Sequence, residues 1–375
     1  MSISNKKKSE CCGCNACAEI CPKHCIRMEE DAKGFLYPKV DRSTCVECGL
    51  CEKVCPFYRE NLSLCFPFTA YAAWNKNREE HWASSSGGAA YVFSDYLIRH
   101  GGVVYGCSAD RMDVRHVCVD SIKQLPKLQG SKYVQSDIRG IFKQIKEDLR
   151  SNRPVLFIGT PCQVAGLKNF IGHIPEHLYL VDLICHGVPS LKMLSAHLAS
   201  IGKGRKVYSL SFRKGTEYRM QISGKGFIYE RTPYWKDTYM RSFMDGFTYR
   251  PSCYYCLYAT PNRVSDVTIG DFWGLNDEVE RPAEKHLGIS VLLPCTEKGF
   301  QLIHATKEQF IFHERTVKEA IAGNTQLRHP TRRTLLNCAF NLLWPLLPFD
   351  TAVKLSVLPQ RTNSFIRVLL HGFRK

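Results

Sequence analysis

Short apolar runs alternate with amphipathic segments along most of the chain. The runs at 155–158 and 179–184 are short and mainly apolar, with Asp182 as the one charged residue of the second, which is typical of strands that a sheet buries on both faces. Residues 137–150 place Ile138, Ile141 and Ile145 on one side at helical spacing, which predicts a helix. The same reasoning predicts further strands at 70–74, 103–106, 116–119, 267–271 and 289–293, and further helices at 89–100 and 235–245. This alternation of strands and helices predicts an α/β body.

Three later segments have a different pattern. Residues 206–212, 219–222 and 227–231 alternate apolar and polar positions, as antiparallel strands do. The stretch 34–38 lies between two cysteine-rich runs and predicts a short strand pair. The expected fold class is therefore α/β in the body and α+β overall.

The composition is that of a globular protein. The 375 residues are 44% hydrophobic and 23% charged, which suits two or three domains with a sizeable core. The formal net charge of +16 suits nucleic acid, an anionic membrane surface or acidic redox partners. Nucleic acid is the weakest of these, because we find neither a nucleic-acid motif nor interleaved aromatic and basic residues. Residues 1–8 have no apolar core, so we expect no signal peptide and a cytoplasmic protein.

Two runs of four cysteines carry the most specific chemistry of the chain. Each has the complete C-x2-C-x2-C-x3-C-P spacing of a bacterial-type ferredoxin, in which the fourth cysteine binds the other cluster. The predicted ligand sets of two 4Fe-4S clusters are Cys11, Cys14, Cys17 and Cys55, and Cys45, Cys48, Cys51 and Cys21. Zinc, a disulfide scaffold and a single surviving cluster remain as alternatives. Cys12 and Cys25 are left over, and we expect packed or merely adjacent thiols there.

Four further cysteines form another set. Cys253 and Cys256 make a C-x2-C pair, whereas Cys162 and Cys185 each follow a predicted strand, where an α/β sheet presents its ligands. We predict that these four thiolates hold a third 4Fe-4S cluster. Structural or free thiols and a zinc site are the alternatives.

Two polar loops are candidates for ligand binding. Residues 84–88, Ser-Ser-Ser-Gly-Gly, open a predicted helix, so small side chains leave room for a ligand beside the free N–H groups of the helix start. A simple helix cap is the alternative. Residues 130–136 put a flexible glycine, Lys132 and Tyr133 in one loop, which could hold a diphosphate and stack on a ring system. A solvated turn is the alternative for this loop.

These stretches resemble, in the same order, the beta-subunit family of coenzyme F420 hydrogenases and dehydrogenases. The resemblance covers residues 10–305 and rests on the cysteine runs, 84–88, 130–133, 159–167, 182–189 and the Cys253/Cys256 pair before 269–274. It implies FAD in the α/β body, clusters connected to the flavin, and hydride exchange with a deazaflavin or another organic acceptor. Bacterial relatives without a hydrogenase partner are often associated with surface-polysaccharide synthesis.

By position, the resemblance implies an FAD site built from three turns. Its residues are Ser85, Ser86, Gly87, Gly88, Ser131, Lys132, Tyr133, Gln135, Gly159, Thr160, Pro161 and Gln163. Lys132 is expected to contact the flavin or its diphosphate, and Tyr133 to stack on a ring. His186 is a candidate catalytic proton donor, with orientation or solvation of the metal site as the alternative.

The expected mechanism follows from electron counting, because clusters carry single electrons and a flavin stores two and releases them as a hydride. The two-cluster module in front of the body departs from the archaeal hydrogenase subunits and favours a soluble ferredoxin-type donor. We therefore expect an iron–sulfur flavoprotein oxidoreductase that reduces coenzyme F420 or a small or glycan-linked acceptor. A non-catalytic electron-transfer subunit and a cluster-bearing scaffold at the membrane surface are the alternatives.

Four parts are expected along the chain. They are a two-cluster ferredoxin-like domain at 1–60, a linker at 61–68, an FAD-binding body at 69–305 and a basic segment at 306–375. Within 330–375, seven Lys or Arg and a single acid, Asp350, accompany an apolar run at 335–349. Pro345 and Pro348 interrupt this run, so it cannot span a membrane as a helix. We expect it to pack on the body rather than to lie on an anionic leaflet as an amphipathic anchor.

Overall fold

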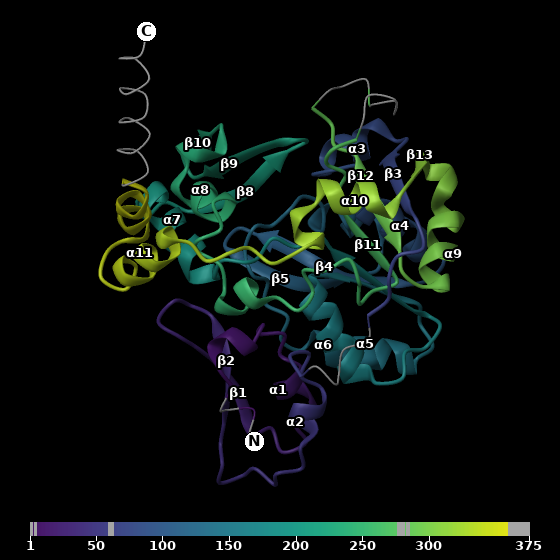
Figure 1. Cartoon of the computed structure of the whole chain (residues 1–375), viewed down its shortest axis with the longest axis horizontal. Coiled ribbons are helices and arrows are strands. Elements are labelled where there is room, and N and C mark those ends of the chain that lie inside the picture. The colour runs from purple at the N-terminus through teal and green to yellow at the C-terminus, as the bar shows by residue number, and fades with distance from the viewer. Residues whose placement is uncertain (1–2, 4–5, 59–63, 276–281, 283–285, 359–375) are drawn as a thin grey trace.

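The computed structural model describes the chain except for residues 1–2, 4–5, 59–63, 276–281, 283–285 and 359–375. The body contains β3 (Ala70–Asn75), β4 (Val103–Asp110), β5 (Asp113–Val119), β6 (Val155–Gly159), β7 (Leu178–Leu183), β11 (Val267–Asp271), β12 (Ser290–Pro294) and β13 (Phe310–Arg315). They form one mixed sheet in the order β13-β3-β12-β11-β7-β6-β4-β5 (Figure 1). The neighbours β11, β7, β6 and β4 run parallel, and the remaining pairs are antiparallel.

Helices cover both faces of this sheet because its buried strands alternate their apolar side chains between two cores. One face carries α5 (Ile141–Arg150) and α6 (Pro161–Ile171), and the other carries α4 (Ala89–Arg99) and α9 (Glu297–Thr306). On β6, Val155 and Phe157 belong to the first core and Leu156 to the second. The predicted α/β class is confirmed.

A small cysteine-rich unit lies at one end of the molecule, in purple in Figure 1. It contains the turn η2 (Lys8–Glu10), the helices α1 (Ala16–Ile20) and α2 (Leu50–Lys53), and the hairpin of β1 (Ile26–Glu30) and β2 (Leu36–Val40). β2 overlaps the stretch 34–38, in which the sequence predicts a strand pair, whereas its partner β1 lies earlier in the chain. α1 packs against α5 and α6, and Ala16 lies in the same core as Phe157. The unit therefore shares a hydrophobic core with the body. Residues 61–63 of the predicted linker lie outside the described residues.

A second lobe is built on a three-stranded antiparallel sheet. Its elements are α7 (Leu191–Gly202), β8 (Val207–Lys214), β9 (Glu217–Gly224), β10 (Phe227–Arg231), α8 (Thr238–Met244) and α11 (Leu335–Leu343). The short helices α3 (Arg78–Ala83) and α10 (Val317–Gly323) accompany the main sheet. Met220, Ile222 and Phe340 are fully buried in the core of the lobe.

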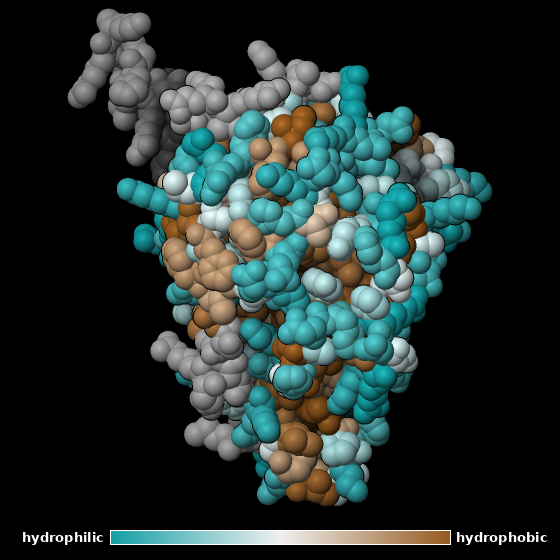
Figure 2. All heavy atoms as spheres, turned by 90° about the vertical axis from the view of Figure 1, so that its right-hand side faces the viewer, coloured by the Kyte–Doolittle hydropathy of each residue, from teal (hydrophilic) through white to brown (hydrophobic). Residues whose placement is uncertain are grey.

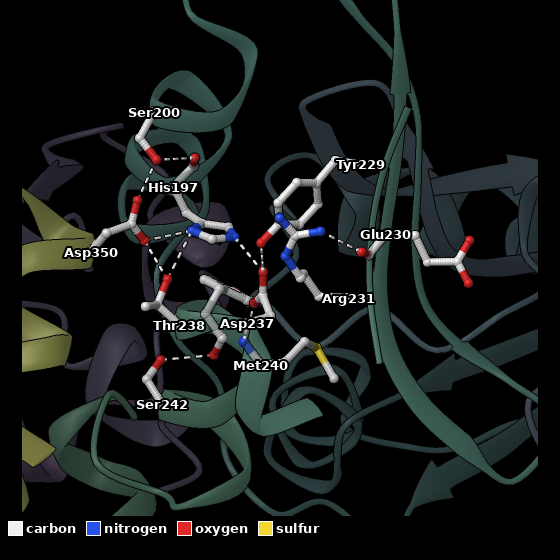
Figure 3. A network of polar contacts seen from close by, with 11 residues as sticks. His197, Ser200, Tyr229, Glu230, Arg231, Asp237, Thr238, Met240, Ser242 and Asp350 are labelled. Carbon is white, nitrogen blue, oxygen red and sulfur yellow. Dashed lines mark hydrogen bonds and ion pairs between the residues drawn. The ribbon is translucent and has the colours of Figure 1, made fainter. Parts of the chain in front are cut away.

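The described residues from 335 onward, which we call the C-terminal segment, pack on this second lobe, as the proline-interrupted pattern predicts. Phe349 and Val357 are buried in the lobe's core. Figure 3 shows the ring of His197 between two carboxylates, with Nδ1 2.6 Å from Asp350 Oδ1 and Nε2 3.0 Å from Asp237 Oδ2. Asp350 thereby ties the segment to α7 and to the start of α8. Among the described helices, none has the length and apolar character needed to cross a bilayer.

Two helices begin later than their apolar pattern predicts, because of the backbone before them. α5 begins at Ile141 since Gly140 takes the left-handed conformation, with φ at +83°. α8 begins at Thr238 since Asp237 caps the helix by accepting a hydrogen bond from the Met240 backbone N–H. The main sheet also extends past residue 305, where the sequence analysis ended the body, because β13 pairs with β3.

Candidate functional site

The first cysteine group lies around α1. Burial raises the pKa of the Cys17 thiol, and the charges of Cys11, Cys55 and Cys51 raise it further. Cys14 interacts electrostatically with Cys17 and Cys55. The structure thus gathers Cys11, Cys14, Cys17 and Cys55, which we call the inner group. This is the combination that a crossing fourth cysteine predicts for one cluster.

The outer group consists of Cys21, Cys45, Cys48 and Cys51. Cys21 Sγ lies 3.3 Å from Cys25 Sγ, and Cys25 in turn interacts with Cys45. Cys51 interacts electrostatically with Cys45, and Cys48 is exposed on the loop between them. Cys25, which has no place in the motif, therefore lies directly beside a predicted ligand, as an adjacent thiol should.

The third group lies at the carboxyl edge of the main sheet. β6 and β7 are adjacent and parallel, so they end at the same edge. Cys162 follows β6 in the first turn of α6, and Cys185 follows β7. Cys253 lies in η6 (Pro251–Tyr255) and Cys256 directly after it. Burial raises the pKa of Cys253, and the charges of Cys185, Cys256 and Cys162 raise it further, so these four thiols are close together.

The donor set of each group fits a 4Fe-4S cluster, which takes four thiolates. Each thiolate of such a cluster binds a different iron, so the ligands stand further apart than those of one ion. Within the described chain, no three His, Cys, Asp or Glu side chains are placed to hold a single metal ion. All 19 cysteines belong to described residues, and none of them forms a disulfide.

A cavity of about 360 Å³ lies beside the third group. All four cysteines of that group line it, together with Cys12. The predicted FAD and catalytic residues that also line it are Ser85, Ser86, Gly88, Ser131, Lys132, Tyr133, Gln135, Gly159, Thr160, Pro161, Gln163 and His186. The fold thus brings loops that are distant in the sequence around one space.

The start of α4 borders this cavity. Gly88 is the N-cap in the left-handed conformation, with φ at +83°, and no side chain caps the helix. Gly88, Ala89 and Ala90 line the cavity, so free N–H groups of the first turn border it. Such donors fit an anion such as the diphosphate of FAD. Gly87 is not among the described lining residues; a Cβ there would lie 2.2 Å from the carbonyl oxygen of Ala73, so this glycine permits close packing on β3.

Several predicted cofactor residues use their polar atoms within the protein. Lys132 Nζ donates to the carbonyl oxygens of Leu128 and Gln129, both at 2.8 Å, and burial lowers its pKa to about 8. Gln163 completes a capping box with Thr160 at the start of α6. These side chains hold the shape of the cavity wall, and their contact with a ligand stays a prediction.

The cavity wall also contains residues that the sequence analysis missed. Arg213 on β8 forms a bidentate ion pair with Asp271 at the end of β11, with N–O distances of 2.6 and 2.8 Å. Phe243, also not predicted, lines the cavity and stacks on the predicted residue Tyr133, with ring centroids 4.4 Å apart. The ion pair joins two different sheets, so no local spacing could have indicated it.

Cys12 lies between the inner and the third group. Its thiol has hydrogen-bonding contacts with the thiols of Cys14 and Cys162. Cys12 is buried, as expected of a packed thiol, but its neighbours are one predicted ligand from each group. Only the tertiary structure shows this connection.

Comparison with known proteins gives two family matches. Residues 10–58 match the 4Fe-4S dicluster domain, and residues 152–320 match the family defined by the C terminus of the coenzyme F420 hydrogenase/dehydrogenase beta subunit. No curated protein matches the chain. A chain of the solved F420-reducing [NiFe] hydrogenase complex from Methanosarcina barkeri is similar at 17% identity and a TM-score of 0.46, over 70% of this chain and 91% of that chain.

The cysteine groups and the dicluster match define the class of protein, an iron–sulfur electron-transfer protein with an α/β body. Within this class, residues 152–320 match the coenzyme F420 hydrogenase/dehydrogenase beta-subunit family, as the motifs of the chain predict. Members of this family are redox subunits of oxidoreductases.

Proposed function

We propose that the protein is an iron–sulfur, flavin-dependent oxidoreductase that passes single electrons inward to FAD. One observation supports this most. The third group lines the same cavity as the predicted FAD loops, and Cys12 connects it to the inner group. The three cysteine groups thus follow one another from the exposed outer end toward the cavity.

In this proposal, the outer and inner groups bind the clusters of the dicluster domain, and the third group binds a further 4Fe-4S cluster. The uncapped start of α4 binds the diphosphate of FAD. FAD, when bound, supplies the conversion of two single electrons and one proton into a hydride. His186 lines the cavity next to Cys185 in the chain and is the proposed proton donor. Coenzyme F420 and small or glycan-linked compounds are the proposed acceptor classes.

We propose that the electron donor, a ferredoxin-type protein or a partner redox subunit, docks at the outer group. Cys48 is exposed there, and its neighbours Val46 and Leu50 are 57% and 37% exposed. Figure 2 shows apolar side chains at the narrow lower end of the molecule, where the cysteine-rich unit lies. Exposed apolar residues that gather on a surface often mark a protein docking site.

The domain boundaries 1–60, 61–68, 69–305 and 306–375 belong to the same proposal. The family match ends at residue 320, and β13 pairs within the main sheet, so both features continue past 305. The described residues after α10 (Val317–Gly323) contribute to the second lobe instead.

Cofactor content of anaerobically purified protein tests the proposed function. We expect about twelve iron and one FAD per chain. The double variant Cys253→Ser/Cys256→Ser is expected to lose about four iron, whereas Cys338→Ser, which changes an exposed thiol on α11, should keep them all. About eight iron without flavin would instead indicate a non-catalytic electron-transfer subunit.

A further surface suggests peripheral contact with an anionic membrane. Leu335, Leu342 and Leu346 are 87%, 74% and 81% exposed and follow one another at helical spacing on α11 and the turn after it. Arg332 and Arg333, also exposed, precede them. A leucine stripe beside cations suits the surface of an anionic leaflet.

Vesicle flotation tests this contact. We expect Leu342→Asp/Leu346→Asp to abolish flotation of the protein with anionic vesicles. Ile228→Asp is the control, because Ile228 is 78% exposed on a different element, β10. Equal flotation of both variants, or none of the unaltered protein, would contradict the membrane contact.

A further inference from the structure

Arg250 is a buried cation between the cysteine-rich unit and the body. Only 1% of its surface is exposed. Its Nε and Nη2 donate to the backbone oxygens of Cys11 and Leu36, each at 2.6 Å, and its Nη1 donates to Gln135 Oε1 at 3.1 Å. Nη2 also lies 3.6 Å from Cys11 Sγ, a sulfur of the inner group.

This guanidinium has no carboxylate partner among the described residues. Two other buried arginines have one, since Arg213 pairs with Asp271 and Arg263 with Asp182. A buried charge without compensation is costly, and hydrogen bonds to neutral oxygens do not neutralise it. The nearest source of negative charge is the inner group, whose four thiolates would give a bound cluster a net negative charge.

A second cation contacts the same group at a different cysteine. Lys6 Nζ lies 3.2 Å from Cys55 Sγ and 3.6 Å from the centre of the Tyr58 ring. By contrast, no Lys or Arg side chain in the described part of the chain is hydrogen-bonded to a sulfur of the outer group. The two cations thus lie beside the inner group, which is the cysteine group that adjoins the body.

We propose that Arg250 and Lys6 hold the inner cluster at a more positive reduction potential than the outer cluster, so that electrons entering at the exposed end move inward. In the step itself, one electron leaves the reduced outer cluster and reduces the inner cluster, and no bond is made or broken. Reduction adds negative charge, so a cation at the ligating sulfur stabilises the reduced form. Burial acts in the opposite direction, but both cations lie within hydrogen-bonding distance of a predicted ligating sulfur, and the low dielectric constant around the buried Arg250 strengthens its effect.

This inference depends on the dicluster domain and not on the third cluster or on FAD. Its failure is therefore distinguishable from failure of the proposed function, which cofactor content decides. Redox titration of the complete chain, followed by electron paramagnetic resonance, measures both potentials. Cys48→Ser changes only the exposed outer group and thereby assigns its signal.

We expect the inner cluster to have the more positive midpoint potential in the unaltered protein. Arg250→Met should shift it to a more negative potential and leave the outer cluster unchanged. Arg250→Lys, which keeps the charge but loses the forked hydrogen bonds, should shift it much less. Lys6→Met should shift it in the same direction as Arg250→Met.

Two results would overturn the proposal. One is an outer cluster that is the more positive in the unaltered protein. The other is an inner potential that stays unchanged in Lys6→Met and in an iron-replete Arg250→Met. If Arg250→Met does not retain its iron, two other measurements decide the question. They are the order of the two midpoint potentials in the unaltered protein and the inner potential of Lys6→Met, whose partly exposed side chain has no buried network to disrupt.

Discussion

Gly166 lies where α6 meets the loop of the inner group. A Cβ built on this residue would lie 2.9 Å from Cys14 Sγ and 3.0 Å from Cys14 Cβ. Real side chains do not approach so closely, so one of the two segments would have to move. The glycine is therefore required by the approach of the cysteine-rich unit and not by the helix itself.

Gly166→Ala is expected to lower both the melting temperature and the iron content, although alanine is the better helix former by about 1 kcal/mol. The reason is that the added methyl group displaces Cys14. Thermal unfolding and an iron assay measure the two effects. Gly202→Ala on α7 is the control, because its Cβ would meet nothing nearer than 3.9 Å. A Gly166→Ala protein that melts higher with full iron would contradict the close approach.

His197 owes its unusual basicity to its surroundings. Burial by itself would lower the pKa of this histidine, but the hydrogen bonds to Asp237 and Asp350 raise it to about 9. Tyr229 donates to Asp237 at 2.8 Å, and Thr238 donates to Asp350 at 2.5 Å. The ring is therefore held as a cation between two carboxylates in the folded protein.

The sign of the pH dependence follows from this shift. The pKa of His197 in the folded protein lies above the ordinary value of 6.5. The proton on His197 therefore stabilises the fold fully below pH 6.5, and this stabilisation is lost as the pH rises through about 9. The shift corresponds to about 3 kcal/mol. We expect His197→Gln to be less stable than the unaltered protein at pH 6. The difference in the free energy of unfolding between the two proteins should shrink toward pH 10. Chemical denaturation measures it, and exposed His173→Gln should show no such trend.

At the scale of elements, α5 receives its N-terminal cap from another part of the chain. Glu19 on α1 accepts hydrogen bonds from the backbone N–H groups of Gly140 at 2.8 Å and Lys143 at 3.0 Å. Asn15 donates to the same carboxylate at 2.7 Å. The cysteine-rich unit thus completes a helix of the body, which joins the two parts by polar bonds as well as by their shared core.

Glu19→Ala is expected to destabilise the protein by about 1–2 kcal/mol, because two N–H groups at the start of α5 lose their acceptor. Urea denaturation measures this loss. Glu29→Ala removes a carboxylate from an exposed ion pair with Lys39 and should change stability by less than about 0.5 kcal/mol. Equal effects of the two substitutions would show that the cap contributes nothing.

For the whole molecule, the C-terminal segment completes the core of the second lobe. Phe349, Val353 and Val357 are at most 3% exposed. A chain that ends at Pro348 lacks these three side chains and Asp350. Its free energy of unfolding should fall by about 6 kcal/mol, because each buried apolar side chain contributes about 2 kcal/mol. A chain that ends at Leu358 keeps these contacts and is expected to melt at a higher temperature than the shorter chain. Calorimetry of both truncations measures the difference, and equal melting would contradict a structural role for the segment.

Most elements of the fold could be predicted because their signals are local. The strand at 155–158 follows from a run of consecutive apolar residues, and the helix containing Ile141 and Ile145 follows from helical periodicity. The starts of α5 and α8 could not be predicted as well, since Gly140 and Asp237 act through backbone geometry rather than hydrophobicity. Strand order was also beyond the sequence, because antiparallel β12 and β13 join the sheet from late in the chain.

The sequence by itself determined the chemistry of the cysteine-rich unit, because ligand spacing in a cluster loop is a local property. It also determined the family resemblance and the alternation of strands and helices. Only the tertiary structure decided which distant residues meet: Cys12 beside Cys162, Arg250 beside Cys11, and Arg213 paired with Asp271. These contacts join residues that are distant in the sequence, and such pairs leave no periodic pattern along a single chain. They arise when burial brings the segments together, which is a property of the whole core.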